Sequence, residues 1–351
     1  MSKSMTSLER VLKAMSHQEA DRVPLFLLFS MYGAKELNLS IEDYYSDPKN
    51  VVRAQIKLRE KYGHDCFYTF YYASIETEAW GGEVIFSEDG PPNSGKPIIT
   101  ERVEISDLKV PDIHSSPCLN RVLETTRELK RYSDEVPIIG VVMSPFSLPV
   151  MQMGFDKYIE MIYEDRQFFD KLMEINEEFC IRWANAQLEA GATAICYFNP
   201  VSSTSIIPKE MYKKTGFQVD KRTISRINGP TVTHVASGRC LPIIEEIIET
   251  GTLGIGVSTL EDIGALKEEC RGKLFVFGNL DGIEMCNWDE GETKKKLEEL
   301  IEKAGSGGGL AISDNHGEIP WQVPEKTLLN ISKYSKILGL YPSKDADLNE
   351  E

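Results

Sequence analysis

Short apolar runs alternate with helical sequence along almost all of the 351-residue chain. Eight of these runs have the length of a buried strand: 23–29, 65–72, 136–143, 192–198, 231–236, 253–257, 273–278 and 310–313. Strict alternation of strand and helix is typical of parallel strands joined by right-handed crossovers. Eight repeats therefore predict an α/β fold, a (β/α)8 TIM barrel, with a doubly wound open sheet as the alternative.

Two segments lie outside this alternation. Residues 7–15 carry apolar side chains at helical spacing, so we expect residues 1–20 to form an N-terminal helical segment. After the second strand, residues 81–112 are rich in Gly, Pro, Asp and Ser around two short β-like pieces, 83–86 and 97–103. We interpret this segment as a β-like excursion from the barrel.

The remaining pattern predicts one domain, residues 1–345, followed by a disordered acidic tail at 346–351. Capping residues and apolar periodicity predict further helices at about 48–62, 119–132, 155–190, 209–227, 241–250, 259–270, 290–304 and 324–339. The 155–190 stretch is long enough for two helices. The glycine-rich residues 305–309 precede a strand, so they are interpreted as a turn rather than a phosphate-binding loop.

Composition narrows the location and the partners. The formal charge of −16 argues against nucleic acid or an anionic membrane as a partner, because both need a concentrated basic face. No apolar run is long enough to cross a bilayer, and the first residues lack an apolar signal core. Seven scattered cysteines without a C-x-x-C pair fit reduced thiols. We therefore expect a cytoplasmic protein.

In a barrel the active face lies at the carboxyl ends of the strands. Several runs change from apolar to polar at that point, as in the stretch that ends the eighth run with Ser313, Asp314, Asn315 and His316. Position alone nominates Met31, Tyr72, Ser144, Asn199, His234, Ser258, Asn279, Asp281, Asn315 and His316.

Chemistry selects three residues from this region as catalytic candidates. His234 and His316 are two of only five histidines and would face each other across the barrel mouth. Neutral imidazole binds zinc, and a catalytic zinc site needs a third ligand, which Glu78 or Glu76 beyond the second strand could supply. The alternative is that each histidine is a hydrogen-bonded structural residue. Tyr72 and its aromatic neighbours could form a wall for a flat or methylated substrate, or pack the core.

Five separated motifs carry a resemblance to a known family: R-V-P at 22–24, P-I-I-G-V-V-M-S-P-F-S-L at 137–148, G-A-T-A-I-C-Y-F-N-P at 191–200, F-G-N-L-D-G at 277–282 and N-H-G-E-I-P-W-Q-V-P at 315–324. In this order they resemble the uroporphyrinogen decarboxylase superfamily. The resemblance implies a barrel. Members include porphyrinogen decarboxylases and methyltransferases that move methyl groups to or from the cobalt of a corrinoid on a partner protein.

The positions at which this sequence differs from the decarboxylase motifs favour the methyltransferase branch of the family. An arginine-rich stretch that holds substrate carboxylates in the decarboxylases reads L-L-F-S-M-Y-G-A-K here, and the decarboxylase aspartate falls on Tyr72. I-E-T-E-A-W-G at 75–81 and Asn199-Pro200 look like the methyltransferase motifs. The zinc ligands of that branch, H-x-C plus a later cysteine, read His234-Val235-Ala236 and His316. His234, His316 and Glu78 are the alternative zinc set.

The resemblance implies a methyltransferase that acts between a small methylated substrate and the cobalt of a corrinoid (cobalamin) protein. The substrate would be an aryl methyl ether, a methylamine or a betaine-like compound. Zinc could assist, and an oligomer is compatible with the sequence. The alternatives are a uroporphyrinogen-type decarboxylase, or a barrel that binds a corrinoid or small ligand without catalysis.

Overall fold

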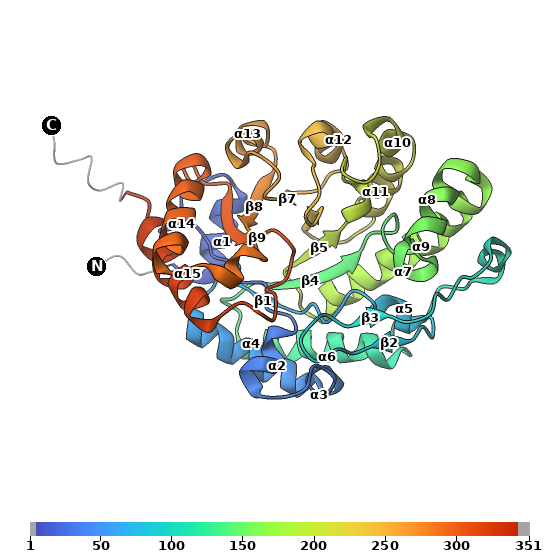
Figure 1. Cartoon of the computed structure of the whole chain (residues 1–351), viewed down its shortest axis with the longest axis horizontal. Helices are drawn as coiled ribbons and strands as arrows, with labels where there is room; N and C mark the ends of the chain where they lie inside the picture. Colours follow the sequence, from blue (N-terminus) through green and yellow to red (C-terminus); the bar gives the residue numbers. More distant parts are fainter. Residues whose placement is uncertain (1–4, 343–351) are drawn as a thin grey trace.

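Seven parallel strands form the central sheet of the computed structural model, which describes residues 5–342. Their order across the sheet is β1 (Phe67–Tyr68), β4 (Ile138–Met143), β5 (Ala194–Phe198), β6 (Thr231–His234), β7 (Gly254–Gly256), β8 (Phe275–Leu280) and β9 (Leu310–Asp314). Figure 1 shows the strands at the centre of the molecule with helices around them. The parallel α/β architecture that the alternation predicts is confirmed.

The first predicted strand, residues 23–29, is not a regular strand. Leu25 makes one isolated parallel bridge to Ile312 of β9. On its other side, the Asp65 N–H, two residues before β1, donates to the Leu25 carbonyl at 2.7 Å. The segment therefore bonds to the edge strand β9 on one side and to the residues that lead into β1 on the other. The described residues form a seven-stranded curled sheet rather than the predicted eight-stranded barrel.

The local sequence explains why this segment forms no longer ladder. Pro24 has no N–H to donate, and the Phe29 N–H bonds back to the Leu27 carbonyl at 2.9 Å. Backbone groups that hydrogen-bond within the segment cannot hydrogen-bond the neighbouring strands. An apolar run of this length predicts burial correctly, but it does not reveal how the backbone is bonded.

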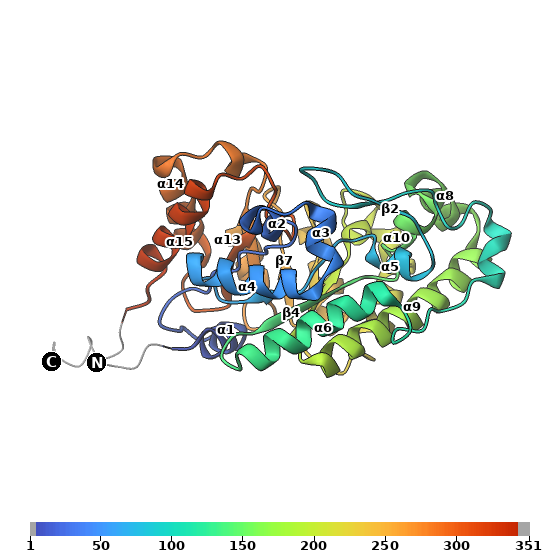
Figure 2. The same ribbon diagram turned by 90° about the horizontal axis from the view of Figure 1, so that it is seen from below.

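The longer helices cover the sheet at the places that the periodicity predicts, whereas several short helices were not predicted. The longer ones are α1 (Ser7–Met15), α4 (Pro48–Tyr62), α6 (Pro117–Tyr132), α8 (Phe155–Glu164), α9 (Arg166–Ala190), α11 (Gly216–Ile224), α14 (Glu290–Ala304) and α15 (Glu325–Leu338). The shorter ones are α2 (Tyr32–Leu37), α3 (Ile41–Ser46), α5 (Ile75–Ala79), α7 (Pro149–Met153), α10 (Lys209–Lys214), α12 (Ile244–Glu249) and α13 (Ile263–Glu269). In Figure 2, α4, α6 and α9 lie side by side on one flank.

Helix boundaries follow local capping chemistry. Asp47 accepts a hydrogen bond from the Lys49 N–H at 2.9 Å to begin α4, and Gly63 ends it in the left-handed region at φ 60. Thr6 and Glu9 form a capping box at the start of α1. Among the helices of the described chain, none is long and apolar enough to span a membrane.

The excursion after β1 contains the short antiparallel pair β2 (Val84–Ile85) and β3 (Asn93–Ser94). The first predicted piece, 83–86, matches β2. The second, 97–103, was placed wrongly, because the pairing partner is Asn93–Ser94 and a 3-10 helix spans Arg102–Asp107. The predicted tail at 346–351 lies outside the described residues.

Side chains complete the sheet where β1 ends early. Beyond Ile139, two side chains bond the edge of β4 that faces β1. Gln187 of α9 accepts from the Val141 N–H at 3.1 Å and donates to the Val141 carbonyl at 2.9 Å. Glu76 of α5 accepts from the Met143 N–H at 2.8 Å. The predicted strand 65–72 is reduced to two paired residues because these side chains replace it.

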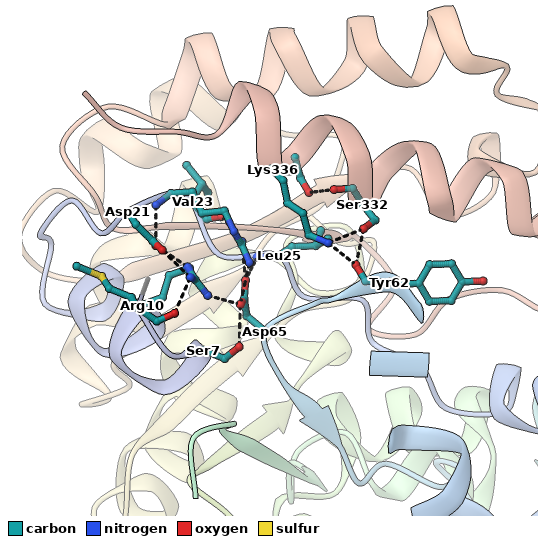
Figure 3. A network of polar contacts seen from close by, with 12 residues as sticks. Ser7, Arg10, Asp21, Val23, Leu25, Tyr62, Asp65, Ser332 and Lys336 are labelled. Atoms are coloured by element: carbon teal, nitrogen blue, oxygen red, sulfur yellow. Dashed lines mark hydrogen bonds and ion pairs between the residues drawn. The ribbon is translucent and has the colours of Figure 1, made fainter. Parts of the chain in front are cut away.

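A buried polar network joins α1, residues 21–25 and the start of β1 (Figure 3). Asp65 accepts from Arg10 Nη1 and from Arg22 Nη1, each at 2.7 Å, from Ser7 Oγ at 2.9 Å and from the Leu25 N–H at 2.9 Å. Its side chain is 1% exposed. This carboxylate holds the irregular segment 23–29 against the edge of the sheet at β1.

Candidate active site

His234, the last residue of β6, is buried between aromatic rings. Its imidazole stacks on Phe198 at 4.8 Å between centroids and meets Phe277 edge-on at 5.4 Å. Gly256 of the adjacent strand provides the space, because a Cβ built there would lie 2.4 Å from the imidazole Cδ2. The sheet therefore fixes the ring in one orientation.

The backbone also fixes the tautomer of His234. Its Nδ1 accepts from the Ala236 N–H at 2.9 Å, so the proton of the neutral ring is on Nε2. Burial, and secondarily the nearby His316, lower the pKa of His234 to about 3. Nε2 is buried without a hydrogen-bond partner in the described chain. At neutral pH His234 therefore presents one unused N–H donor.

The loop after β9 is folded around Asp314. Its Oδ1 accepts from the N–H groups of His316 at 2.9 Å, Gly317 at 2.7 Å and Glu318 at 3.1 Å. Its Oδ2 is buried and without a partner in the described residues, and burial raises the pKa of this carboxyl. The Tyr68 hydroxyl donates to the Gly317 carbonyl at 2.7 Å and ties the loop to β1.

This loop carries His316 and approaches His234. A Cβ built on Gly317 would lie 3.6 Å from His234 Nε2 and 2.4 Å from Phe198, so the loop backbone closely approaches both rings. His316 Nδ1 is buried and has no hydrogen-bond partner in the described chain. Unpartnered polar atoms of His234, at the end of β6, and of His316, in the loop after β9, therefore both lie at the carboxyl ends of the sheet.

Glu318 belongs to the same loop and was not singled out from the sequence. Ser30, just beyond the irregular segment, donates its hydroxyl to the Glu318 carboxyl. Burial is the main cause that raises the pKa of Glu318 to about 7; the charge of Asp314 adds to this, and the Ser30 bond opposes it. The sequence feature that could have identified Glu318 is a carboxylate in the segment after the last strand without a lysine or arginine next to it. Met31 follows Ser30 and is buried at the start of α2.

Glu78 does not join the histidines. It accepts from the Tyr72 hydroxyl at 2.6 Å and pairs with Arg121 of α6 at 3.3 Å. Tyr72 also packs edge-on against Phe86 of the excursion at 5.7 Å. Two of the nominated residues, Tyr72 and Glu78, thus form a separate cluster with a cation that the sequence argument did not include.

The residues present do not fit the zinc site considered from the sequence. In the described part of the chain, no group of three or more His, Cys, Asp or Glu side chains is arranged to hold a metal ion. His234 Nε2 carries the ring proton because Nδ1 faces an N–H, and a metal ligand needs a free lone pair. The carboxylate of Glu78 is occupied by Tyr72 and Arg121.

Ser144 and Asn199 belong to a buried hydrogen-bond network at the ends of β4 and β5. Asn199 Oδ1 accepts from Ser144 Oγ at 2.7 Å and from Ser147 Oγ at 2.9 Å, and its Nδ2 donates to Asp220 at 2.8 Å. Asp220 also accepts a hydrogen bond from the Tyr197 hydroxyl, and burial raises the pKa of Asp220 to about 7. With their hydrogen bonds used internally, these amide and hydroxyl groups shape the ends of β4 and β5.

Asn279, Asp281 and Asn315 hydrogen-bond backbone groups of the loops after β7 and β8. Asn279 donates to the Ser258 carbonyl at 3.1 Å, Asp281 accepts from the Ile283 N–H at 2.9 Å, and Asn315 accepts from the Gly282 N–H at 3.1 Å. The side chain of Ser258 donates to the Ser237 carbonyl at 2.8 Å. These contacts place the loop beside His316, because a Cβ on Gly282 would lie 2.9 Å from His316 Nδ1.

Comparison with known proteins identifies the relatives of this chain. The family model described as uroporphyrinogen decarboxylase (URO-D) matches residues 6–335. The uroporphyrinogen decarboxylase of Actinobacillus pleuropneumoniae serotype 5b is 22% identical, with 93% of this chain and 97% of that protein covered. The enzyme of the same name from Ralstonia pickettii is 24% identical and covers 87% of each chain.

Solved structures support the fold. A methyltransferase from Methanosarcina mazei superposes with a TM-score of 0.86 at 19% identity, covering 95% of this chain and 99% of that one. A B12-independent methionine synthase from Shewanella sp. W3-18-1 superposes with a TM-score of 0.55 at 14% identity, covering 85% and 89% of the two chains. At these identities the likeness concerns the fold.

Proposed function

Since the chain belongs to the uroporphyrinogen decarboxylase family, we propose that it is an enzyme that transfers a methyl group between a small methylated compound and the cobalt of a corrinoid carried by a separate protein. The corrinoid is a second substrate in this scheme. The methyl compound would be an aryl methyl ether, a methylamine or a betaine-like molecule. The Methanosarcina mazei methyltransferase, which shares the fold over nearly the whole chain, supports this branch of the family.

One observation carries the proposal: the charges that act on the site are not those of lysine or arginine. Among the described residues, no lysine or arginine side chain hydrogen-bonds or ion-pairs with His234, Asp314, His316 or Glu318; the partners of these groups are backbone N–H groups and the Ser30 hydroxyl. A porphyrinogen with many carboxylates needs clustered cations. A methyl compound needs an apolar, aromatic wall and a donor for the leaving atom, which Phe198, Phe277 and His234 can supply.

The residues would act by orientation and hydrogen bonding. Reduced cobalt must approach the methyl carbon in line with the bond that breaks, so the substrate has to be held in one pose. Aromatic side chains around His234 would pack the apolar part of the substrate and exclude water. The Nε2–H of His234 would donate to the atom that leaves, where negative charge develops.

An anaerobic spectroscopic assay tests the proposal. Purified protein is mixed with reduced cobalamin, or a reduced corrinoid protein, and pools of methoxyaromatics, methylamines and betaines, while the methylcobalamin spectrum is recorded. We expect a methylated spectrum with one pool. Decarboxylation of uroporphyrinogen without methyl transfer would replace this proposal with the decarboxylase reading, which similarity to the curated relatives favours. Saturable corrinoid binding without either product would indicate a binding protein.

A pair of histidine variants links activity to the site. His234→Ala removes the Nε2–H donor, and loss of one positioned donor typically costs about 100-fold or more in turnover. The matched control is His114→Ala, which changes an exposed histidine outside the site. Circular dichroism checks that both variants fold. Wild-type turnover in a folded His234→Ala enzyme would contradict the assigned role.

A further inference from the structure

We propose that Glu318 is the acid that protonates the leaving oxygen of the methyl donor, which assigns methyl ethers, with aryl methyl ethers foremost, as the substrate class. This inference rests on the proposed methyl transfer and deepens it. It distinguishes among the three donor types, because the chemistry of the leaving group differs: an alkoxide or phenolate leaves best with a proton, whereas a quaternary amine leaves as a neutral amine and needs none.

The hydrogen bonds of Asp314 fix Glu318 next to the part of the loop that approaches His234. Its N–H donates to Asp314 Oδ1 at 3.1 Å, in the same set of bonds that orients His316 and Gly317. Gly317 approaches His234 Nε2, and its carbonyl is fixed by Tyr68. Glu318 is thus one residue from the point where the loop approaches His234.

One oxygen of the Glu318 carboxyl accepts a hydrogen bond, and the other has no hydrogen-bond partner among the described residues. Oε2 accepts from the Ser30 hydroxyl, which anchors the group to the end of the irregular segment 23–29. Oε1 has no hydrogen-bond partner among the residues that the structure describes. A carboxylic acid held through one oxygen can carry its proton on the other, where a substrate atom can receive it.

The surroundings favour the protonated acid and a neutral ligand. Glu318 interacts electrostatically with Asp314 of β9, Tyr45 of α3 and Tyr68 of β1, and His316 lies two residues before it in the same loop. Among the described residues no lysine or arginine bonds to Glu318, and burial raises the pKa of Glu318 to about 7, so a large fraction is protonated near neutrality. A cationic amine would be held by ionised carboxylates, whereas burial shifts the pKa of both Asp314 and Glu318 upward and so favours their neutral forms.

The step balances with the two proposed substrates. The electron pair of reduced cobalt forms the bond to the methyl carbon, and the carbon–oxygen bond breaks. Its electron pair passes to the oxygen, which takes the proton from Glu318 and leaves as an alcohol or phenol. Cobalt is formally oxidised by two electrons as it is methylated, and the Glu318 carboxylate recovers a proton from solvent.

A leaving-group series tests the assignment. Wild type and Glu318→Gln are assayed with methoxyarenes whose phenols range from weakly to strongly acidic, and with tetramethylammonium and trimethylglycine. The control is Glu302→Gln, an exposed change on α14. We expect methylcobalamin from the ethers and not from the amines. Glu318→Gln should slow the ethers of weakly acidic phenols by about 100-fold, and those of strongly acidic phenols by less than about 10-fold.

The pH profile and a second variant complete the test. With a weakly acidic phenol as leaving group, the wild-type rate should fall as pH rises above about 7, and Glu318→Gln should lose this dependence. Ser30→Ala, which frees the carboxyl, should give an intermediate loss with the same leaving-group trend. Equal slowing of all ethers by Glu318→Gln, or turnover of the amines, would overturn the inference while leaving methyl transfer intact. Failure of every donor to methylate cobalt would instead refute the proposed function.

Discussion

Replacing Asp65 by asparagine should strongly destabilise the fold, because this carboxylate joins three segments of the chain. Its Oδ1 accepts from Ser7, Arg10 and Arg22, and its Oδ2 from Arg22 and the Leu25 N–H. Asp65→Asn keeps the size of the side chain. It removes the negative charge and turns one of these acceptor atoms into an amide that faces N–H groups.

The structure sets the magnitude of this effect. Asp65 is 1% exposed and Arg10 is 6% exposed, so solvent cannot take over the lost interactions. Removing one partner of a buried ion pair costs about 3–5 kcal/mol, since the remaining charge stays buried. If the new amide replaces Oδ2, the Leu25 N–H also loses its acceptor, which alone costs about 1–3 kcal/mol. We expect a total near the upper part of the ion-pair range.

Urea unfolding, followed by circular dichroism and tryptophan fluorescence, measures this loss. Asp21→Asn is the matched control: Asp21 also binds Arg10, but its side chain is 31% exposed, so its loss should cost about 1 kcal/mol. The free energy of unfolding of Asp65→Asn should therefore fall well below that of the control. A loss under about 1 kcal/mol for Asp65→Asn, or equal losses for both variants, would refute the reasoning.

Three further predictions concern the strand ends. Burial raises the pKa of Glu76 to about 8 from an ordinary 4.5, so between these pH values the folded state holds a proton that the unfolded chain has released. The free energy of unfolding should therefore fall by up to roughly 5 kcal/mol as pH rises from 4.5 to 8. Urea titrations at several pH values should show a flatter pH dependence for Glu76→Gln. Gly317 has a φ of 87, and Gly317→Ala would place a Cβ 2.4 Å from Phe198, the ring that stacks on His234. Turnover in the methyl-transfer assay should drop at least about 10-fold, with little change in circular dichroism. Gln187→Met should cost about 2–4 kcal/mol in urea unfolding, because two buried backbone groups of β4 lose their partners.

Local chemistry made much of the fold predictable. The helices Ser7–Met15 and Pro48–Tyr62 were predicted with the observed bounds, because apolar spacing and capping residues act within a few residues of each other. The parallel order follows from the alternation of strands and helices. Short helices such as α2 and α5 were missed, because five or six residues carry too little periodicity to identify them.

Long-range contacts decided what the sequence could not. An aromatic run at 65–72 has strand composition, but Glu76 and Gln187 bond the β4 edge that it would have paired with. The same limit applies to the site. His234 and His316 stand out as rare residues at strand ends, whereas the role of Glu318 depends on Ser30, almost three hundred positions away in the chain. No local pattern signals such a contact.

The tautomer of His234 connects the departures from the family motif with the proposed chemistry. Where the related zinc motif would place a cysteine, Ala236 adopts a left-handed φ of 52, a conformation that costs an alanine about 1–2 kcal/mol. Its N–H bonds to His234 Nδ1, which turns the opposite side of the ring into a donor. In the same resemblance, His316 stands at the position of the second cysteine. In our scheme, leaving-group activation therefore depends on the protons of His234 and of the partly buried Glu318.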